Sequence, residues 1–136
     1  MGEAPGPVDR DHREARRPSR VYDVGEEPDP RFSMANERTA LAWMRTALAL
    51  VGGGVAIVSV SSLDGMPGWA PLVGAASCLG GGALALRSVS AWARVERALR
   101  LGLPLPAPRA LAMLAAGVVA LAALTLTLSV VELTTR

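Results

Sequence analysis

The sequence predicts an all-α integral membrane protein with three transmembrane helices, the first two of which extend into the cytoplasm. Three observations predict it. Apolar residues make up 51% of the 136 positions, they gather in long blocks, and aromatic residues are only 4% of the chain. A soluble core built from Ala, Leu, Val and Gly would be poorly filled, whereas helices in lipid use small residues for their contacts.

Three stretches without a charged residue form the predicted spans. They cover residues 46–63, 69–86 and 110–131, which are 18, 18 and 22 residues long. At about 1.5 Å per residue they extend about 27 to 33 Å, close to the hydrocarbon core of about 30 Å. In a soluble protein of this length they would leave too few polar residues to cover them, so three crossings are expected.

Arginines in the short flanks predict the orientation, because cytoplasmic loops carry an excess of basic residues. All 14 basic residues are Arg, which is typical of a GC-rich bacterial genome. The link at residues 64–68 contains no arginine. The chain is therefore expected in the cell (inner) membrane, with its N-terminus in the cytoplasm and its C-terminus on the extracytoplasmic side. Arginines occur before the first span and between the second and third spans, at Arg31, Arg38, Arg45, Arg87, Arg94, Arg97, Arg100 and Arg109.

The N-terminal residues differ in composition from the membrane domain at residues 29–136. Residues 1–28 mix Pro, Gly and both charge signs with almost no apolar periodicity, which predicts a disordered cytoplasmic tail. Asp29 and Pro30 are a good N-cap and first-turn pair, so the first helix is expected to begin there and to run into the membrane.

The second helix is expected to continue beyond its span. Glu96 and Arg100 have a favourable i,i+4 spacing in an amphipathic stretch after Trp92. Gly102 and the prolines that follow it predict the end of this helix.

One side of the first helix combines arginines with small side chains. We call it the Arg38 face; its residues fall within about 60° of Arg38 in projection. They are Arg38, Ala42, Arg45, Ala49, Gly52, Ala56 and Ser59. Two interpretations stay open, namely close packing between helices and the lining of a polar path.

The arginines near the membrane also have two interpretations. Arg45 is expected at the boundary of the first span, where it can extend its side chain toward water, and topological anchoring accounts for most of these arginines. The sharper alternative is an anion-attracting vestibule formed by Arg38, Arg45 and Arg94, with Glu37 as the counter-charge.

The second span carries another small-residue ridge, at Ser77, Gly81 and Ala85. One three-helix chain cannot enclose both this ridge and the Gly52 and Ala56 positions, which predicts a homo-oligomer. The glycine triplets of both spans lack the strand and Lys that a phosphate-binding loop needs, so close helix approach is expected there.

Catalytic chemistry has no candidate constellation in this sequence. His12 is the one histidine and Cys78 the one cysteine, and no paired carboxylates accompany them, so neither a metal site nor acid–base catalysis is expected. We therefore expect a protein that is not an enzyme, needs no cofactor, binds no nucleic acid and has the lipid bilayer as a partner.

Two segments carry a family resemblance. Asp29 to Leu50, DPRFSMANERTALAWMRTALAL, and especially Ala35 to Thr39, Leu41, Trp43 and Arg45, resembles the N-terminal motif of the YidH-like membrane proteins, domain-of-unknown-function family 202. Trp92 to Pro106, WARVERALRLGLPLP, resembles that family's link between the second and third helices. Together the two segments place the chain from about residue 29 onward within the resemblance.

The resemblance extends to the transmembrane module of the vacuolar transporter chaperone, which shares the fold and in which similar modules surround a basic conduit for polyphosphate. It implies that Arg38 and Arg45 face such a path and that Glu37 pairs with a neighbouring arginine. The chain lacks the polymerase and phosphate-sensing domains of that complex, so synthesis is not implied and translocation is an analogy at the level of fold.

Two functions follow as hypotheses. The first is a self-associating membrane subunit that forms or regulates a path for an anion or polyanion. The alternative is a membrane scaffold or assembly factor that docks a cytoplasmic partner.

Overall fold

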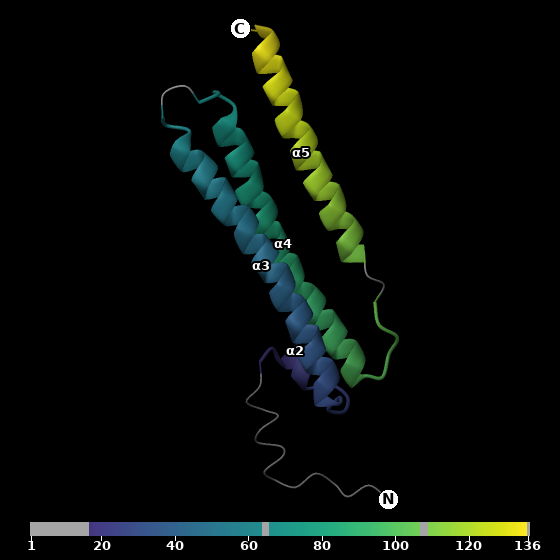
Figure 1. Cartoon of the computed structure of the whole chain (residues 1–136). Coiled ribbons are helices and arrows are strands. Elements are labelled where there is room, and N and C mark those ends of the chain that lie inside the picture. Colours follow the sequence, from purple (N-terminus) through teal and green to yellow (C-terminus); the bar gives the residue numbers. More distant parts are fainter. Residues whose placement is uncertain (1–16, 64–65, 107–108, 136) are drawn as a thin grey trace, which may run out of the picture. The chain divides into compact units, whose positions relative to one another are not determined.

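The computed structural model describes residues 17–63, 66–106 and 109–135, and it is built from helices (Figure 1). Helix α2 spans Ser19–Tyr22, α3 spans Pro30–Val60, α4 spans Ala70–Arg100 and α5 spans Arg109–Thr135. In these described ranges no residue lies in a strand. The three long helices are long and apolar enough to cross a membrane, which confirms the predicted fold class.

The chain forms two compact units. Unit 1 contains Met1–Ala40 and Val89–Pro106, and unit 2 contains Leu41–Ser88 and Ala107–Arg136. Helices α3 and α4 each contribute residues to both units, because their residue ranges cross the boundaries at residues 40 and 88. Unit 1 is described below by its polar contacts, and unit 2 by the packing of its apolar helices.

Both helix ends that the sequence predicts in unit 1 are confirmed. Helix α3 begins at Pro30, and the side chain of Asp29 accepts a hydrogen bond of 2.9 Å from the N–H of Arg31. Helix α4 ends at Arg100, where Gly102 has a φ of 62° and the N–H of Leu103 donates to the carbonyl of Ala98. A left-handed glycine with this bond is the usual way in which a helix satisfies its last carbonyls.

The prediction of a disordered tail through residue 28 is wrong for its last part. Residues 19–22 form α2, and Val21 is almost fully buried at 1% exposure. A single helical turn is too short to show periodicity, so the sequence pattern could not reveal it. Residues 1–16 lie outside the described residues.

Unit 2 contains a close contact between α3 and α4. A Cβ added to Gly81 would lie 2.7 Å from the carbonyl oxygen of Ala47, and one added to Gly54 would lie 2.5 Å from the carbonyl oxygen of Gly74. The Ser77 hydroxyl donates a hydrogen bond of 2.8 Å to the carbonyl of Leu50. Small residues thus allow the two backbones to approach closely, as they do in other membrane helix pairs.

Helix α5 packs much less closely in unit 2. In its most apolar stretch no residue is buried, and large side chains such as Leu111, Val119 and Leu126 are about two-thirds exposed. In a bilayer these side chains would face lipid, where exposure of apolar groups carries no hydrophobic penalty. The tight helix pair of unit 2 is therefore α3 with α4.

Candidate functional site

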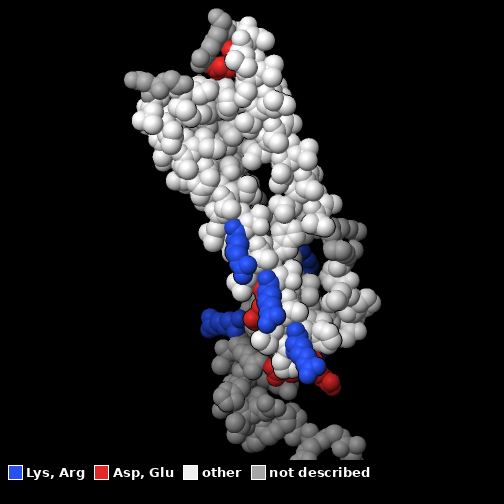
Figure 2. Space-filling view, viewed as in Figure 1, with Lys and Arg blue, Asp and Glu red and all other residues white. Residues whose placement is uncertain are grey.

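The Arg38 face is a continuous exposed surface of α3. All seven of its residues are exposed in the single chain. Ala47 and Gly54, which are buried, lie about 160° to 180° from Arg38 in helical projection. The face therefore points away from α4, and in Figure 2 the basic side chains gather along the first half of α3 whereas the apolar stretches are white.

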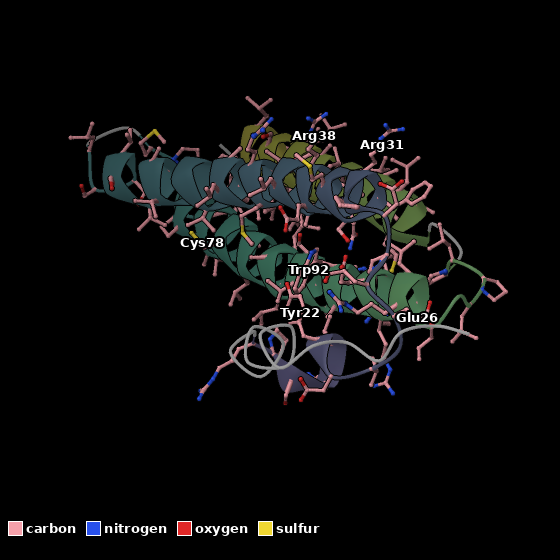
Figure 3. All side chains as sticks on the ribbon, turned by 90° about the horizontal axis from the view of Figure 1, so that it is seen from below. Tyr22, Glu26, Arg31, Arg38, Cys78 and Trp92 are labelled. Atoms are coloured by element: carbon pink, nitrogen blue, oxygen red, sulfur yellow. The ribbon has the colours of Figure 1, made fainter. Side chains whose placement is uncertain are left out.

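Arg31 is a third arginine on this side of α3, in addition to the predicted Arg38 and Arg45. Arg31 precedes Arg38 by seven residues, so it lies about 20° away on the same side of α3, and it is also exposed. Figure 3 shows Arg31 and Arg38 on the side of α3 away from Trp92. The seven-residue spacing of Arg31, Arg38 and Arg45 was the signal that could have revealed this third member. Glu37 is exposed beside Arg38 in the sequence.

Arg94 does not join Arg38 in the single chain. It is exposed on α4, two residues before the buried Glu96, and two residues correspond to about 160° on a helix. Arg38 likewise follows Asn36 by two residues, and Asn36 contacts α4. Each arginine points away from the other helix, so any convergence of the two would need a second chain.

A buried carboxylate organises unit 1. Glu96 is 3% exposed, and its two oxygens accept different donors from α3. The Ser33 hydroxyl donates to Oε1 at 2.8 Å, and Asn36 Nδ2 donates to Oε2 at 3.2 Å. The Asn36 amide also contacts the carbonyl of Trp92 at 3.2 Å. These contacts join the beginning of α3 to the end of α4 and satisfy a carboxylate that would be costly to bury alone.

Arg100 connects this carboxylate to α2. Its Nε lies 3.8 Å from Glu96 Oε1, which confirms the i,i+4 pair expected from the sequence. Its guanidinium carbon lies 4.7 Å from the centre of the Tyr22 ring, and that ring lies 6.4 Å from the ring of Trp92 at an angle of 54°. A cation over a tyrosine face and a tilted aromatic pair are both favourable, so α2 is held against α4.

The segment after α2 also binds the last carbonyl group of α4. The N–H of Glu26 donates a hydrogen bond of 3.0 Å to the carbonyl of Arg100. Gly25 has a φ of 65°, and a Cβ there would overlap the same carbonyl. Glycine is therefore required by both the backbone conformation and the close approach.

These contacts suit a structural role. Both oxygens of Glu96 are engaged by donors, and among the described residues no group of three or more His, Cys, Asp or Glu side chains could hold a metal ion. The roles of Ser33, Asn36 and Tyr22 in these contacts were not predicted from the sequence. The available signal was the i,i+3 spacing of Ser33 and Asn36 on the side of α3 opposite Arg38.

The helix-packing residues divide between two surfaces. Ser77 and Gly81 are buried against α3, and Ala85 is half-buried. Gly52 and Ala56 are exposed, and a Cβ at Gly52 would meet no atom within 4 Å. The chain thus encloses one small-residue surface and leaves the other open.

Comparison with known proteins gives the family. The inner membrane protein YidH of Escherichia coli K12 is 41% identical over 87 residues, which are 64% of this chain and 76% of that protein. The uncharacterised protein Rv2272 of Mycobacterium tuberculosis is 40% identical over 80 residues, which are 59% of this chain and 66% of that protein. No solved structure matches the chain significantly.

The match to a protein family covers both helices that form the buried network. The family described as Domain of unknown function (DUF202) matches residues 31–98, half of the chain, so both Asn36 and Glu96 fall within it. The predicted resemblance to the YidH-like membrane proteins is confirmed, and the chain belongs to the DUF202 family of membrane proteins.

Proposed function

We propose that this chain is a non-enzymatic subunit of the inner membrane that associates with copies of itself through the Arg38 face of α3. The observation that carries the proposal is the exposure of all seven residues of this face in the single chain. Within the apolar stretch the face consists of Ala49, Gly52, Ala56 and Ser59, and no large side chain covers them.

The composition of the surrounding surface supports this choice. Leu48 and Val55 beside the Arg38 face are 65% and 53% exposed, and α5 exposes large apolar residues along its length. Lipid-facing surfaces present such side chains, whereas small residues let helices approach closely and gain dispersion contacts. The Arg38 face has the composition of a helix contact.

Self-association would also bring the arginines together. Arg38 and Arg45 from several copies, joined by Arg31, would form a positively charged ring, the arrangement by which pores concentrate anions. Glu37 is the counter-charge that would limit repulsion within such a ring. A path for an anion or polyanion is thus the activity we propose for the assembly.

The orientation is part of the proposal. The arginines before α3 and between the second and third spans favour a cytoplasmic N-terminus, and the relative named YidH is called an inner membrane protein. Gly68, in the link between α3 and α4, is exposed. After Cys78→Ser, a Gly68→Cys variant is expected to react with a membrane-impermeant thiol reagent added outside the cell; reaction only after the cytoplasmic side is opened would reverse the orientation.

Oligomer mass tests the proposal. In lipid nanodiscs the wild-type chain is expected to give a discrete multiple of the protomer mass, and Gly52→Leu is expected to reduce it. Gly82→Leu is the matched control, because Gly82 is also an exposed helix glycine whose Cβ would meet nothing within 4 Å, but it lies on α4. A wild-type monomer, or equal masses for both variants, would rule the proposal out.

A scaffold that docks a cytoplasmic partner is the second candidate. It is favoured by Phe32 and Met34, which are 60% and 55% exposed at the start of α3 in unit 1. Large apolar side chains exposed outside an apolar span are typical of a protein contact. A protein that stays monomeric in lipid and loses a bound partner on Phe32→Ser would favour this function over the first.

A further inference from the structure

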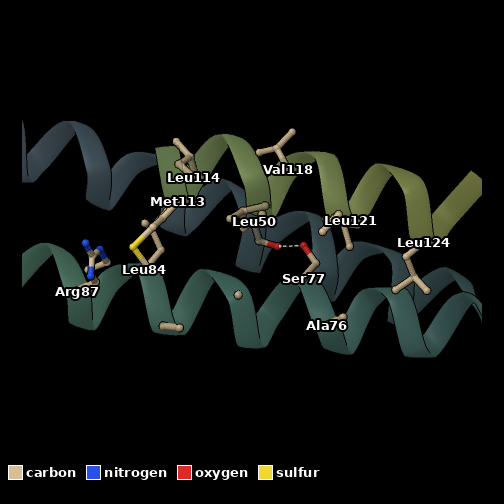
Figure 4. Close-up of a pocket in the computed structure, with 14 residues that line it drawn as sticks. Leu50, Ala76, Ser77, Leu84, Arg87, Met113, Leu114, Val118, Leu121 and Leu124 are labelled. Atoms are coloured by element: carbon tan, nitrogen blue, oxygen red, sulfur yellow. Dashed lines mark hydrogen bonds between the residues drawn. The ribbon is translucent and has the colours of Figure 1, made fainter. Parts of the chain in front are cut away.

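Unit 2 contains a pocket of about 420 Å³ between α4 and α5, with Leu50 of α3 at its floor (Figure 4). Its lining is apolar except for two side chains, Ser77 and Arg87. The Ser77 hydroxyl is already donated to the carbonyl of Leu50. Arg87 is the charged side chain among the lining residues, which include no Asp or Glu.

The space in the pocket is unfilled because small residues of both α4 and α5 line it. Gly80 on α4 and Gly117 on α5 face it, and a Cβ at either position would meet no atom within 4 Å. Leu84, Leu114 and Leu121 supply its apolar walls. An apolar space of this kind leaves its lining without contacts on one side, so an apolar chain that enters it gains dispersion energy.

The length of the pocket matches one leaflet. Its lining on α4 runs from Ala76 to Arg87, eleven positions, or about 16 Å along a helix. Half of a hydrocarbon core of about 30 Å is about 15 Å. Figure 4 shows Arg87 at one end and Ala76, Leu121 and Leu124 toward the other. The charged group therefore lies where the head group of a lipid would lie if its acyl chain filled the pocket.

The charge at this end is positive. Met113 and Leu114, in the first turns of α5, line the pocket near Leu84 and Arg87 (Figure 4). The Arg87 guanidinium supplies the positive charge at this end of the pocket. A head group with a net negative charge is favoured over a zwitterionic one.

We propose that this pocket binds one anionic phospholipid, with its phosphate at the Arg87 guanidinium and an acyl chain between α4 and α5. The guanidinium offers the planar pair of donors that suits a phosphate. The bound lipid would fill the space between the loosely packed α5 and the α3–α4 pair of unit 2, and so act as part of the folded protein. This site is separate from the Arg38 face and does not depend on it.

Lipid retention on the full chain tests the proposal. Protein purified in mild detergent is mixed with equal amounts of phosphatidylglycerol and phosphatidylcholine that carry the same acyl chains, and bound lipids are counted by native mass spectrometry. The wild type is expected to retain phosphatidylglycerol preferentially. Arg87→Gln is expected to lower this preference about tenfold, the size of one charge-assisted hydrogen bond, whereas Arg94→Gln, an exposed arginine that does not line the pocket, should not.

A second pair of variants tests the acyl chain. Gly80→Leu fills the pocket and is expected to remove the retained lipid with helix content unchanged, whereas Gly82→Leu, outside the pocket, should keep it. Should Arg87→Gln fail to fold, Arg87→Lys keeps the positive charge but loses the planar donor pair, so it should keep a weaker preference for phosphatidylglycerol, and complete loss of the preference there would overturn the proposal. Three other results would also overturn the proposal. The wild type could retain the two lipids equally, or the two leucine variants could retain equal amounts of lipid. The third result is cross-linking of Ala83→Cys to α5 of a second copy, which would mean that a helix and not a lipid fills the pocket.

Discussion

Asn36 and Glu96 lie 60 residues apart in the chain and are joined by a hydrogen bond of 3.2 Å from the amide to the carboxylate. One belongs to the ANERT segment of α3 and the other to the WARVERALR segment of α4. The two segments that carry the family resemblance are therefore two halves of one contact. Their shared polar residues hold unit 1 together, and the arginines of α3 lie on the opposite side of the helix.

Glu96→Gln is expected to destabilise unit 1 by about 1–3 kcal/mol, the cost of leaving a buried polar group unsatisfied. Ser33 and Asn36 donate to different carboxylate oxygens, and an amide has only one acceptor oxygen, so it would place an N–H₂ group against a donor. Hydrogen exchange of the amides in residues 89–100 measures the effect. Glu37→Gln, at an exposed position of α3, is the control; similar exchange in both variants would contradict the assigned role of Glu96.

Gly25→Ala is expected to release the segment after α2 from the end of α4. Alanine adopts a φ of 65° at a cost of about 1–3 kcal/mol, and its Cβ would overlap the carbonyl of Arg100. The amide of Glu26, which donates to that carbonyl, should exchange faster with solvent. Gly82→Ala serves as the control because nothing lies near its Cβ position, and unchanged protection of Glu26 in the Gly25 variant would show that the contact is unimportant.

Gly81→Leu and Gly80→Leu are expected to differ sharply although the residues are neighbours. A Cβ at Gly81 would lie 2.7 Å from atoms of both Ala47 and Val51 of α3, whereas a Cβ at Gly80 would meet nothing within 4 Å and would point its side chain into the open pocket. Overpacking of this kind costs about 1–3 kcal/mol or more, so only the Gly81 variant should show a lower melting temperature in detergent. Equal melting temperatures would mean that α3 and α4 do not pack as described.

Arg38→Lys and Arg45→Lys test the anion path without altering charge. Lysine keeps the orientation signal but loses the planar fork that binds phosphate or carboxylate through two donors. Anion binding or flux in liposomes is expected to fall several-fold in each variant, and Arg97→Lys, at an exposed position of α4 outside the proposed ring, should match the parent. The anion path would be refuted if both Lys variants equalled the parent or if the parent showed neither binding nor flux.

Much of the fold could be predicted because it depends on local signals. Uncharged stretches of about 20 residues identify spanning helices, Asp29 with Pro30 determines the start of α3, and Gly102 determines the end of α4. Each of these signals acts within a few residues of the feature that it specifies.

The contacts between helices could not be predicted in the same way. The Ser77 and Gly81 ridge indicated close packing, but the same composition suits a contact within the chain or between chains. Likewise the i,i+4 spacing predicted the pair of Glu96 with Arg100, whereas the hydrogen bonds of Glu96 to Ser33 and Asn36 depend on how α3 and α4 align. The four residues of α2 are too few to show an apolar periodicity, so the burial of Val21 within unit 1 could not be predicted.

Cysteine cross-linking tests self-association through the Arg38 face most directly. In a Cys78→Ser background, Ala49→Cys places a thiol on this face, and Leu79→Cys places one on the side of α4 away from α3. The two positions lie at similar depth, because Ala47 contacts Gly81 and Leu50 contacts Ser77 in the antiparallel pair. Under mild oxidation in native membranes we expect Ala49→Cys to form disulfide-linked dimers and Leu79→Cys to remain monomeric. Equal cross-linking of the two variants, or none for Ala49→Cys, would contradict the proposal.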